Sequence, residues 1–98
     1  MTDNQLAELL TLRAYVGHSG ERYWTNSDSQ LHRVYGPAVI WPNGDCDWYR
    51  NGAYHRTDGP ALDSRSGDAV MWYLDGQQLT QAQWAQRIGD MENKNAGE

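Results

Sequence analysis

The middle of the chain contains an internal repeat, which restricts the possible folds more than any other feature of the sequence. Residues 31–45 align without a gap on residues 54–68, at an offset of 23, and seven of the fifteen aligned pairs are identical. The shared positions are His-Arg, then Gly-Pro-Ala, then Gly-Asp. Identity of this extent is not expected by chance. We therefore interpret the chain as two full units and an opening half-unit.

The recurring aromatic pairs, turn dipeptides and Gly-Pro steps of each unit predict β-hairpins. Every unit opens with a pair of aromatic residues, and a turn dipeptide follows the second and third pairs. Both central positions of a type I′ turn need positive φ, which Asn, Asp and Gly tolerate. Pro lacks an N–H, so the two Gly-Pro steps are expected to begin strands or to lie at an edge. The aromatic pairs are residues 23–24, 48–49 and 72–73. The turn dipeptides are Asn51-Gly52 and Asp75-Gly76, and the Gly-Pro steps are Gly36-Pro37 and Gly59-Pro60.

The 98 residues are enough for one domain, which we place at 1–89. Residues 1–20 are interpreted as a helix over 2–15, with Thr2 or Asp3 as N-cap, and a linker. Residues 21–79 carry the hairpin repeats. Residues 80–89 are predicted to form a closing helix, because Thr80 and Gln83 have the spacing of a capping box. Residues 90–98 are expected to be a flexible tail.

This pattern predicts an α+β fold, mainly β: an antiparallel meander of six to eight short strands, flanked by an N-terminal and a C-terminal helix. The composition adds one hint about the surface of that sheet. There are five Trp and six Tyr residues but no Phe, so every aromatic ring carries a hydrogen-bonding group. Such rings suit half-buried positions that meet water or a partner. Exposed meander edges also make a homodimer plausible.

Charge and cysteine content exclude several functional classes. The net charge is −5, and no cluster of Lys and Arg is present, so direct binding to a nucleic-acid backbone is not expected. Apolar runs are too short for a membrane helix, and the N-terminus lacks the features of a signal peptide. Cys46 is the single cysteine, which fits a reducing cytoplasm and excludes an internal disulfide.

The motif series W-Y-x-N-G, H-R-x-D-G-P-A and W-Y-x-D-G resembles a repeat of small proteins from tailed bacteriophages and giant viruses. It is also similar to MORN-type repeats, which build β-hairpins from units of about this length. The resemblance covers residues 21–88. It implies hairpin architecture and a viral accessory protein in the host cytoplasm, and it implies little about activity. Unit one departs from the pattern, with Val34-Tyr35 in place of Thr57-Asp58 and Ser27-Asp28-Ser29 in place of an Asn-Gly turn.

The recurring His-Arg pairs have a functional and a structural interpretation. His32 and His55 could ligate a metal or transfer protons, but recurrence at one repeat position favours an imidazole that bonds a turn carbonyl or Asp58. Arg33 and Arg56 are expected to stack on neighbouring Trp or Tyr rings, or else to contact an acidic partner. No H-x-H, H-E-x-x-H or C-x-x-C motif occurs, so neither metal nor cofactor is predicted.

The aspartates lie mostly in or beside predicted turns, and nothing places a carboxylate pair in an apolar pocket, so no catalytic residue is assigned. Cys46 is interpreted as an inert small hydrophobe, because neighbouring aspartates would raise its pKa. The best binding candidates are the rings that the repeat does not require: Trp41 aligns with Ser64, and Tyr35 aligns with Asp58. The predicted partner-binding residues are Trp41, Tyr35, Arg33, Asp45 and Asp47.

Three functions remain open. We favour a non-enzymatic, phage-type accessory protein that binds a host protein complex and inhibits it, as an anti-defence protein (anti-CRISPR-like, for example) or host-takeover factor would. The first alternative is a virion, assembly or oligomerisation module. The second is a small metal protein or enzyme that depends on His32 and His55.

Overall fold

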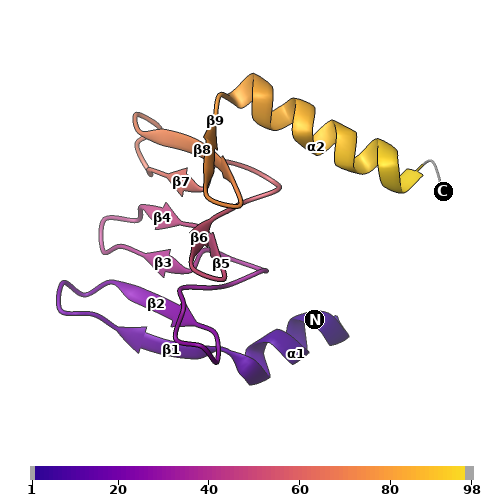
Figure 1. The fold of residues 1–98 in the computed structure, drawn as a ribbon. Helices are drawn as coiled ribbons and strands as arrows, with labels where there is room; N and C mark the ends of the chain where they lie inside the picture. Colours follow the sequence, from indigo (N-terminus) through magenta and orange to yellow (C-terminus); the bar gives the residue numbers. More distant parts are fainter. Residues whose placement is uncertain (1, 97–98) are drawn as a thin grey trace.

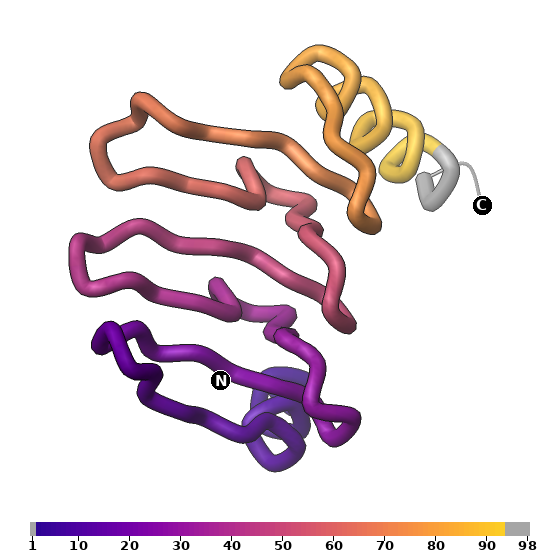
Figure 2. The backbone as a smooth tube through the Cα atoms, turned by 60° about the vertical axis from the view of Figure 1, so that its left-hand side comes forward, coloured from indigo at the N-terminus to yellow at the C-terminus, as the bar shows by residue number. Residues whose placement is uncertain are grey.

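The computed structural model describes residues 2–96, with side chains described for residues 2–93. The chain forms an α+β fold in which antiparallel hairpins follow one another and a helix stands at each end (Figure 1). The tube in Figure 2 shows the hairpins as successive layers in chain order. The elements are α1 (Asp3–Thr11), β1 (Arg13–Val16), β2 (Arg22–Thr25), β3 (Val39–Ile40), β4 (Cys46–Asp47), β5 (Tyr49–Arg50), β6 (Ala53–Tyr54), β7 (Leu62–Asp63), β8 (Val70–Leu74), β9 (Gln77–Leu79) and α2 (Gln81–Ala96).

The sheet is not a simple meander. Within residues 2–96, seven strands form one antiparallel sheet in the order β1-β2-β3-β4-β7-β8-β9, and β5 and β6 form a separate hairpin. This hairpin leaves the sheet, so β4 pairs with β3 and β7 and not with β5. The prediction of antiparallel hairpins between two helices is confirmed. The expected six to eight strands become nine within the described residues, because the inserted hairpin was not foreseen as a second sheet.

The turn dipeptides adopt the predicted geometry. Asn51 and Gly52, between β5 and β6, have φ values of 50° and 84°. Asp75 and Gly76, between β8 and β9, have φ values of 49° and 81°. Positive φ at both central positions is what a type I′ turn requires, and its twist matches that of the paired strands.

The helix prediction for 2–15 is wrong over 12–15. The helix begins as expected at Thr2, whose hydroxyl accepts from the Gln5 N–H at 3.1 Å while the Gln5 side chain accepts from the Thr2 N–H at 2.8 Å. Leu12 is extended, with ψ 147°, and β1 follows. Tyr15 pairs with Tyr23 of β2, and their rings stack at 5.1 Å. Sheet pairing therefore overrides the helical spacing of the preceding leucines.

The C-terminal helix is longer than predicted. Thr80 and Gln83 form the expected capping box, with hydrogen bonds of 3.1 and 2.9 Å between side chain and backbone. The helix α2 then continues to Ala96, so the expected tail is helical over 90–96. Residues 97–98 lie outside the described part of the chain. The closing role of the helix is confirmed, because Trp84 packs on Trp72 at 4.6 Å between ring centroids.

Each unit is held together by an arginine that lies between a tryptophan ring and a glycine. The Arg56 guanidinium lies 3.9 Å over the Trp48 ring and donates to the Pro60 carbonyl at 3.1 Å. A Cβ at Gly59 would lie 2.7 Å from the Arg56 Cζ, so any side chain there would displace the guanidinium. The stacking prediction is thus confirmed, and it explains the glycine of the Gly-Pro-Ala motif. The first unit repeats the arrangement with Arg33, Trp24, Pro37 and Gly36.

The buried core is small. Over residues 2–93, the buried apolar residues are Ala38, Val39, Ala61, Leu74 and Leu79. Two of these, Ala38 and Ala61, are the alanines of the Gly-Pro-Ala motif, and neither exposes any surface. The amphipathic rings and the stacked arginines therefore supply most of the remaining packing between layers.

Candidate functional site

One face of the large sheet carries a row of side chains that are apolar or aromatic except for one aspartate. Residues paired across neighbouring strands point to the same side, so the register defines this row. We call this side the groove face. Its members, in order from β1 to β8, are Tyr15, Tyr23, Val39, Asp47, Leu62 and Met71. Tyr15 and Met71, at the two ends, are 42% and 40% exposed.

A groove of about 380 Å³ lies in the middle of this face. Its apolar wall includes Tyr23, Trp41 and Tyr49, and the charged residues of its lining are both acidic: Glu21 and Asp47. Trp41 remains 38% exposed, and its indole N–H donates to the Asp47 carboxylate at 2.9 Å. That bond fixes the indole at the groove, where it presents a flat apolar surface beside a carboxylate.

The structure separates the five predicted binding residues into two places. Trp41 and Asp47 line the groove. Arg33 and Tyr35 lie elsewhere, and together they line a cavity of about 370 Å³ beside Glu8 of α1. Asp45 belongs to the turn between β3 and β4, where its side chain accepts from the Arg65 and Asn43 N–H groups. Trp41 and Tyr35 thus line different cavities, and their role in binding a partner stays a prediction.

Sequence reasoning missed two tyrosines of the groove and the tyrosine at the edge of its face. Tyr23 and Tyr49, which line the groove, belong to the repeated aromatic pairs, and Tyr15 falls within the predicted helix. The signal that could have found them is strand register, since every second residue of a strand shares one face. Recurrence in the repeat favoured a packing role for these tyrosines. A ring that recurs for packing can nevertheless expose one of its two faces.

The two repeat histidines close the hairpin turns. His32 Nδ1 accepts from the Asn51 backbone N–H at 2.9 Å, and His55 Nδ1 accepts from the Asp75 backbone N–H at 3.0 Å. The structural interpretation is supported, although the predicted partners, a turn carbonyl or Asp58, are wrong. An accepting Nδ1 must be unprotonated. Burial lowers the pKa of both imidazoles, and the charge of Arg50 lowers them further against the opposing effect of Glu8 on His32 and Asp75 on His55.

The cysteine thiol is a poor nucleophile. Burial raises the pKa of Cys46, and the charges of Asp63, Asp47 and Asp45 raise it further. The thiol donates a weak hydrogen bond to the Gly44 carbonyl at 3.6 Å. The predicted effect of the neighbouring aspartates is confirmed in direction, with burial as the larger cause.

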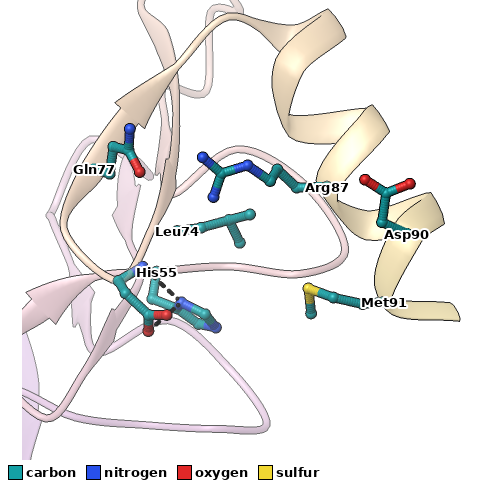
Figure 3. A pocket seen from close by; sticks show the side chains of 7 residues that line it. His55, Leu74, Gln77, Arg87, Asp90 and Met91 are labelled. Atoms are coloured by element: carbon teal, nitrogen blue, oxygen red, sulfur yellow. Dashed lines mark hydrogen bonds and ion pairs between the residues drawn. The ribbon is translucent and has the colours of Figure 1, made fainter. Parts of the chain in front are cut away.

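A cleft of about 370 Å³ separates α2 from the β8–β9 hairpin (Figure 3). Leu74 lies at its centre, and Arg87, Asp90 and Met91 project from the helix. His55 lies below, where it bonds to Asp75 in the turn between β8 and β9. The charged side chains of the lining are one basic, Arg87, and two acidic, Asp75 and Asp90.

Across the described part of the chain, no group of three or more His, Cys, Asp or Glu side chains is arranged to hold a metal ion. Neither helix, over the residues that the structure describes, is long and apolar enough to cross a membrane. Comparison of the chain with protein-family models, with curated proteins and with solved structures found no match. The likeness to viral repeat proteins therefore stays a prediction.

Proposed function

We propose that this chain is a non-enzymatic binding protein that holds a partner protein against its groove face. The observation that carries the proposal is the exposed indole of Trp41, fixed by Asp47 beside Tyr23 and Tyr49 in a preformed groove. Trp and Tyr are enriched at energetically dominant interface positions, and a ring that is already fixed loses little freedom on binding.

The charge of the groove indicates the kind of partner segment. The lining carboxylates, Glu21 and Asp47, stand among apolar walls. A segment with an apolar residue flanked by Lys or Arg would complement both features. Following the resemblance to phage repeat proteins, we extend the proposal to a component of a host protein complex that is inhibited when the groove is occupied.

A pair of aromatic variants tests the proposal. Trp41→Ala removes the groove ring, and Tyr35→Ala removes a ring that is 46% exposed but lies outside the groove. The partner is first captured from host lysate and purified, and its affinity for each variant is then measured by calorimetry. We expect Trp41→Ala to weaken binding by about 2 kcal/mol, roughly 30-fold, and Tyr35→Ala to leave it nearly unchanged.

The inhibition itself needs a second readout. The activity of the purified host complex should fall when wild-type chain is added and should be retained with Trp41→Ala. Equal affinities of the two variants would contradict the groove as the binding surface. Binding without any loss of host activity would contradict the inhibitory role while leaving the binding role intact.

A further inference from the structure

A second cavity, of about 240 Å³, lies between the first and second units and differs from the groove in its chemistry. The chain as a whole carries a net charge of −5, yet this cavity concentrates basic side chains. Three of the seven arginines line it, with one carboxylate among them. The polar and aromatic lining that matters here is Arg33, Arg50, Arg56, Trp48, His55 and Asp58.

The lining holds three buried N–H groups that have no hydrogen-bond partner. They are Trp48 Nε1, Arg50 Nε and His55 Nε2, and they are three of the four such side-chain atoms over residues 2–93. His55 is 8% exposed. Its Nδ1 lies 3.0 Å from the Asp75 backbone nitrogen and 3.2 Å from the Asp75 carboxylate. In the tautomer whose Nδ1 accepts from the backbone N–H, Nε2 carries the hydrogen and is a donor. Buried N–H donors almost always have a hydrogen-bond acceptor in a folded protein. Three such donors without an acceptor around one cavity therefore indicate that a ligand supplies it.

Arg50 is the residue at which the second unit departs from the repeat. The aligned position in the third unit is Leu74, which is 7% exposed and packs as a core residue. A guanidinium at this place is therefore not needed to build the unit. Arg33 and Arg56 are occupied by their tryptophan rings and proline carbonyls, whereas the Nε of Arg50 is free.

The charge balance of the lining selects the ligand. Three guanidinium groups oppose the single carboxylate of Asp58, which already accepts from Arg56 Nε at 2.8 Å. Arg56 also pairs with Asp63 at 3.3 Å, and Glu8 lies close enough to Arg33 to act on its charge, so the positive charge left over is chiefly that of Arg50. A phosphate oxygen suits this charge, because charge-assisted N–H donors are the usual way to hold one. The volume exceeds by far the roughly 10–15 Å³ that a water molecule needs, so a group attached to the phosphate also has space.

We infer that this cavity is a phosphate-binding site, in which the ligand's oxygens accept from Trp48 Nε1, Arg50 Nε and His55 Nε2. The inference is independent of the proposed function, because it involves a different cavity and different residues. The phosphate could be free or part of a larger molecule, and the experiment separates these two sources.

The test is a titration of the full chain with inorganic phosphate at constant ionic strength, followed by ¹⁵N–¹H spectroscopy of the indole N–H groups. The Trp48 indole signal should move and saturate, while the Trp41 signal stays in place. Arg50→Leu installs the residue that the third unit carries at this position, so folding is expected to persist. It should weaken phosphate binding at least tenfold. The matched control Arg65→Leu removes an exposed arginine outside the cavity and should change affinity less than twofold.

Arg50→Lys keeps the charge without the Nε–H, and it should bind phosphate with an affinity between those of wild type and Arg50→Leu. Phosphoserine or adenosine monophosphate binding more tightly than inorganic phosphate would identify a phosphorylated molecule as the ligand, and equal affinities would identify free phosphate. The inference fails if the Trp48 signal does not move, if both leucine variants weaken binding equally, or if acetate binds as tightly as phosphate.

Discussion

The two ends of the hairpin array differ although their helices begin alike. Both α1 and α2 start with a Thr-x-x-Gln capping box, formed by Thr2 with Gln5 and by Thr80 with Gln83. At the C-terminal end the helix covers the last unit, whereas none of the residues of α1 is buried. A capping box therefore fixes where a helix begins, but an anchoring side chain decides whether the helix closes the array.

Trp84 is that anchor. Its ring packs on Trp72, and its indole N–H donates to the Arg56 carbonyl at 2.8 Å, which joins α2 to two successive units. The leucines of α1 have no such contact, and Leu10 is 79% exposed. Glu8 supplies the main link of α1 to the first unit, by accepting from the Val34 and Tyr35 backbone N–H groups.

The largest expected effect comes from removing the anchor. Trp84→Ala deletes the ring contact and the bond to the Arg56 carbonyl, and it should lower the free energy of unfolding by about 3 kcal/mol. Urea unfolding followed by circular dichroism measures this. Leu10→Ala, the control at the other end, should change stability by less than about 0.5 kcal/mol. Similar losses for the two variants would show that both ends are closed.

Within the array, the units should behave alike even though the ends differ. Gly59→Ala and Gly36→Ala each place a methyl group against a stacked guanidinium, at 2.7 and 2.8 Å from Cζ. Each should lower the free energy of unfolding by about 2 kcal/mol, because the arginine must leave its tryptophan ring. Gly89→Ala in α2 meets no atom within 4 Å and should stabilise the helix by up to about 1 kcal/mol. An unchanged free energy of unfolding for Gly59→Ala would show that the arginine can move and still pack on its tryptophan ring.

The turn histidines should make stability depend on pH. The folded pKa of His55 lies below its ordinary value of 6.5, chiefly because of burial. The unfolded chain therefore binds the proton first as the pH falls. The stability that comes from a neutral His55 is therefore fully present above about pH 6.5 and is lost as the pH falls below it. Protonation also removes the hydrogen bond from the Asp75 N–H, which we expect to contribute about 1 kcal/mol. Urea unfolding at pH 7.5 and 5.0 measures the difference.

His55→Asn is the control for this pH effect. Its amide oxygen can still accept from the Asp75 N–H but does not titrate. The variant should lose less stability than wild type between pH 7.5 and 5.0. An unchanged slope would place the acid sensitivity in other groups.

The sequence predicted the parts of this molecule that depend on local rules. The type I′ turns, the capping box of Thr80 and Gln83, and the arginine stacks each follow from a few neighbouring residues. What it did not predict depends on pairing between distant strands. Tyr15 entered a strand only because Tyr23 lies opposite, and Trp41 and Tyr35 were grouped because both break the repeat. Whether two such residues share a surface is decided by register, which a single sequence encodes weakly.

The last prediction concerns β1, the edge strand at the N-terminal end of the hairpin array. All four residues of β1 are exposed, and one edge of the strand has no neighbouring strand within the described residues. The Gly17 N–H donates to the Glu21 carbonyl, so the alternation of antiparallel bonds turns the Ala14 and Val16 N–H groups outward. Two copies could pair here about a two-fold axis at Tyr15, which would extend the Tyr15–Tyr23 stack across the interface.

This register makes a specific electrostatic prediction. Arg13 would lie opposite the partner's Gly17, over which the Glu21 carboxylate folds, so each dimer would contain two Arg13–Glu21 contacts. Arg13→Glu and Glu21→Arg should each weaken self-association several-fold, because exposed pairs contribute about 0.2–1 kcal/mol each. Sedimentation across a concentration series measures it. A mixture of the two variants should restore association, since each chain then carries the charge its partner lacks. A wild-type chain that stays monomeric at high concentration would show instead that short β1, with its exposed arginine, is enough to protect an open edge from pairing.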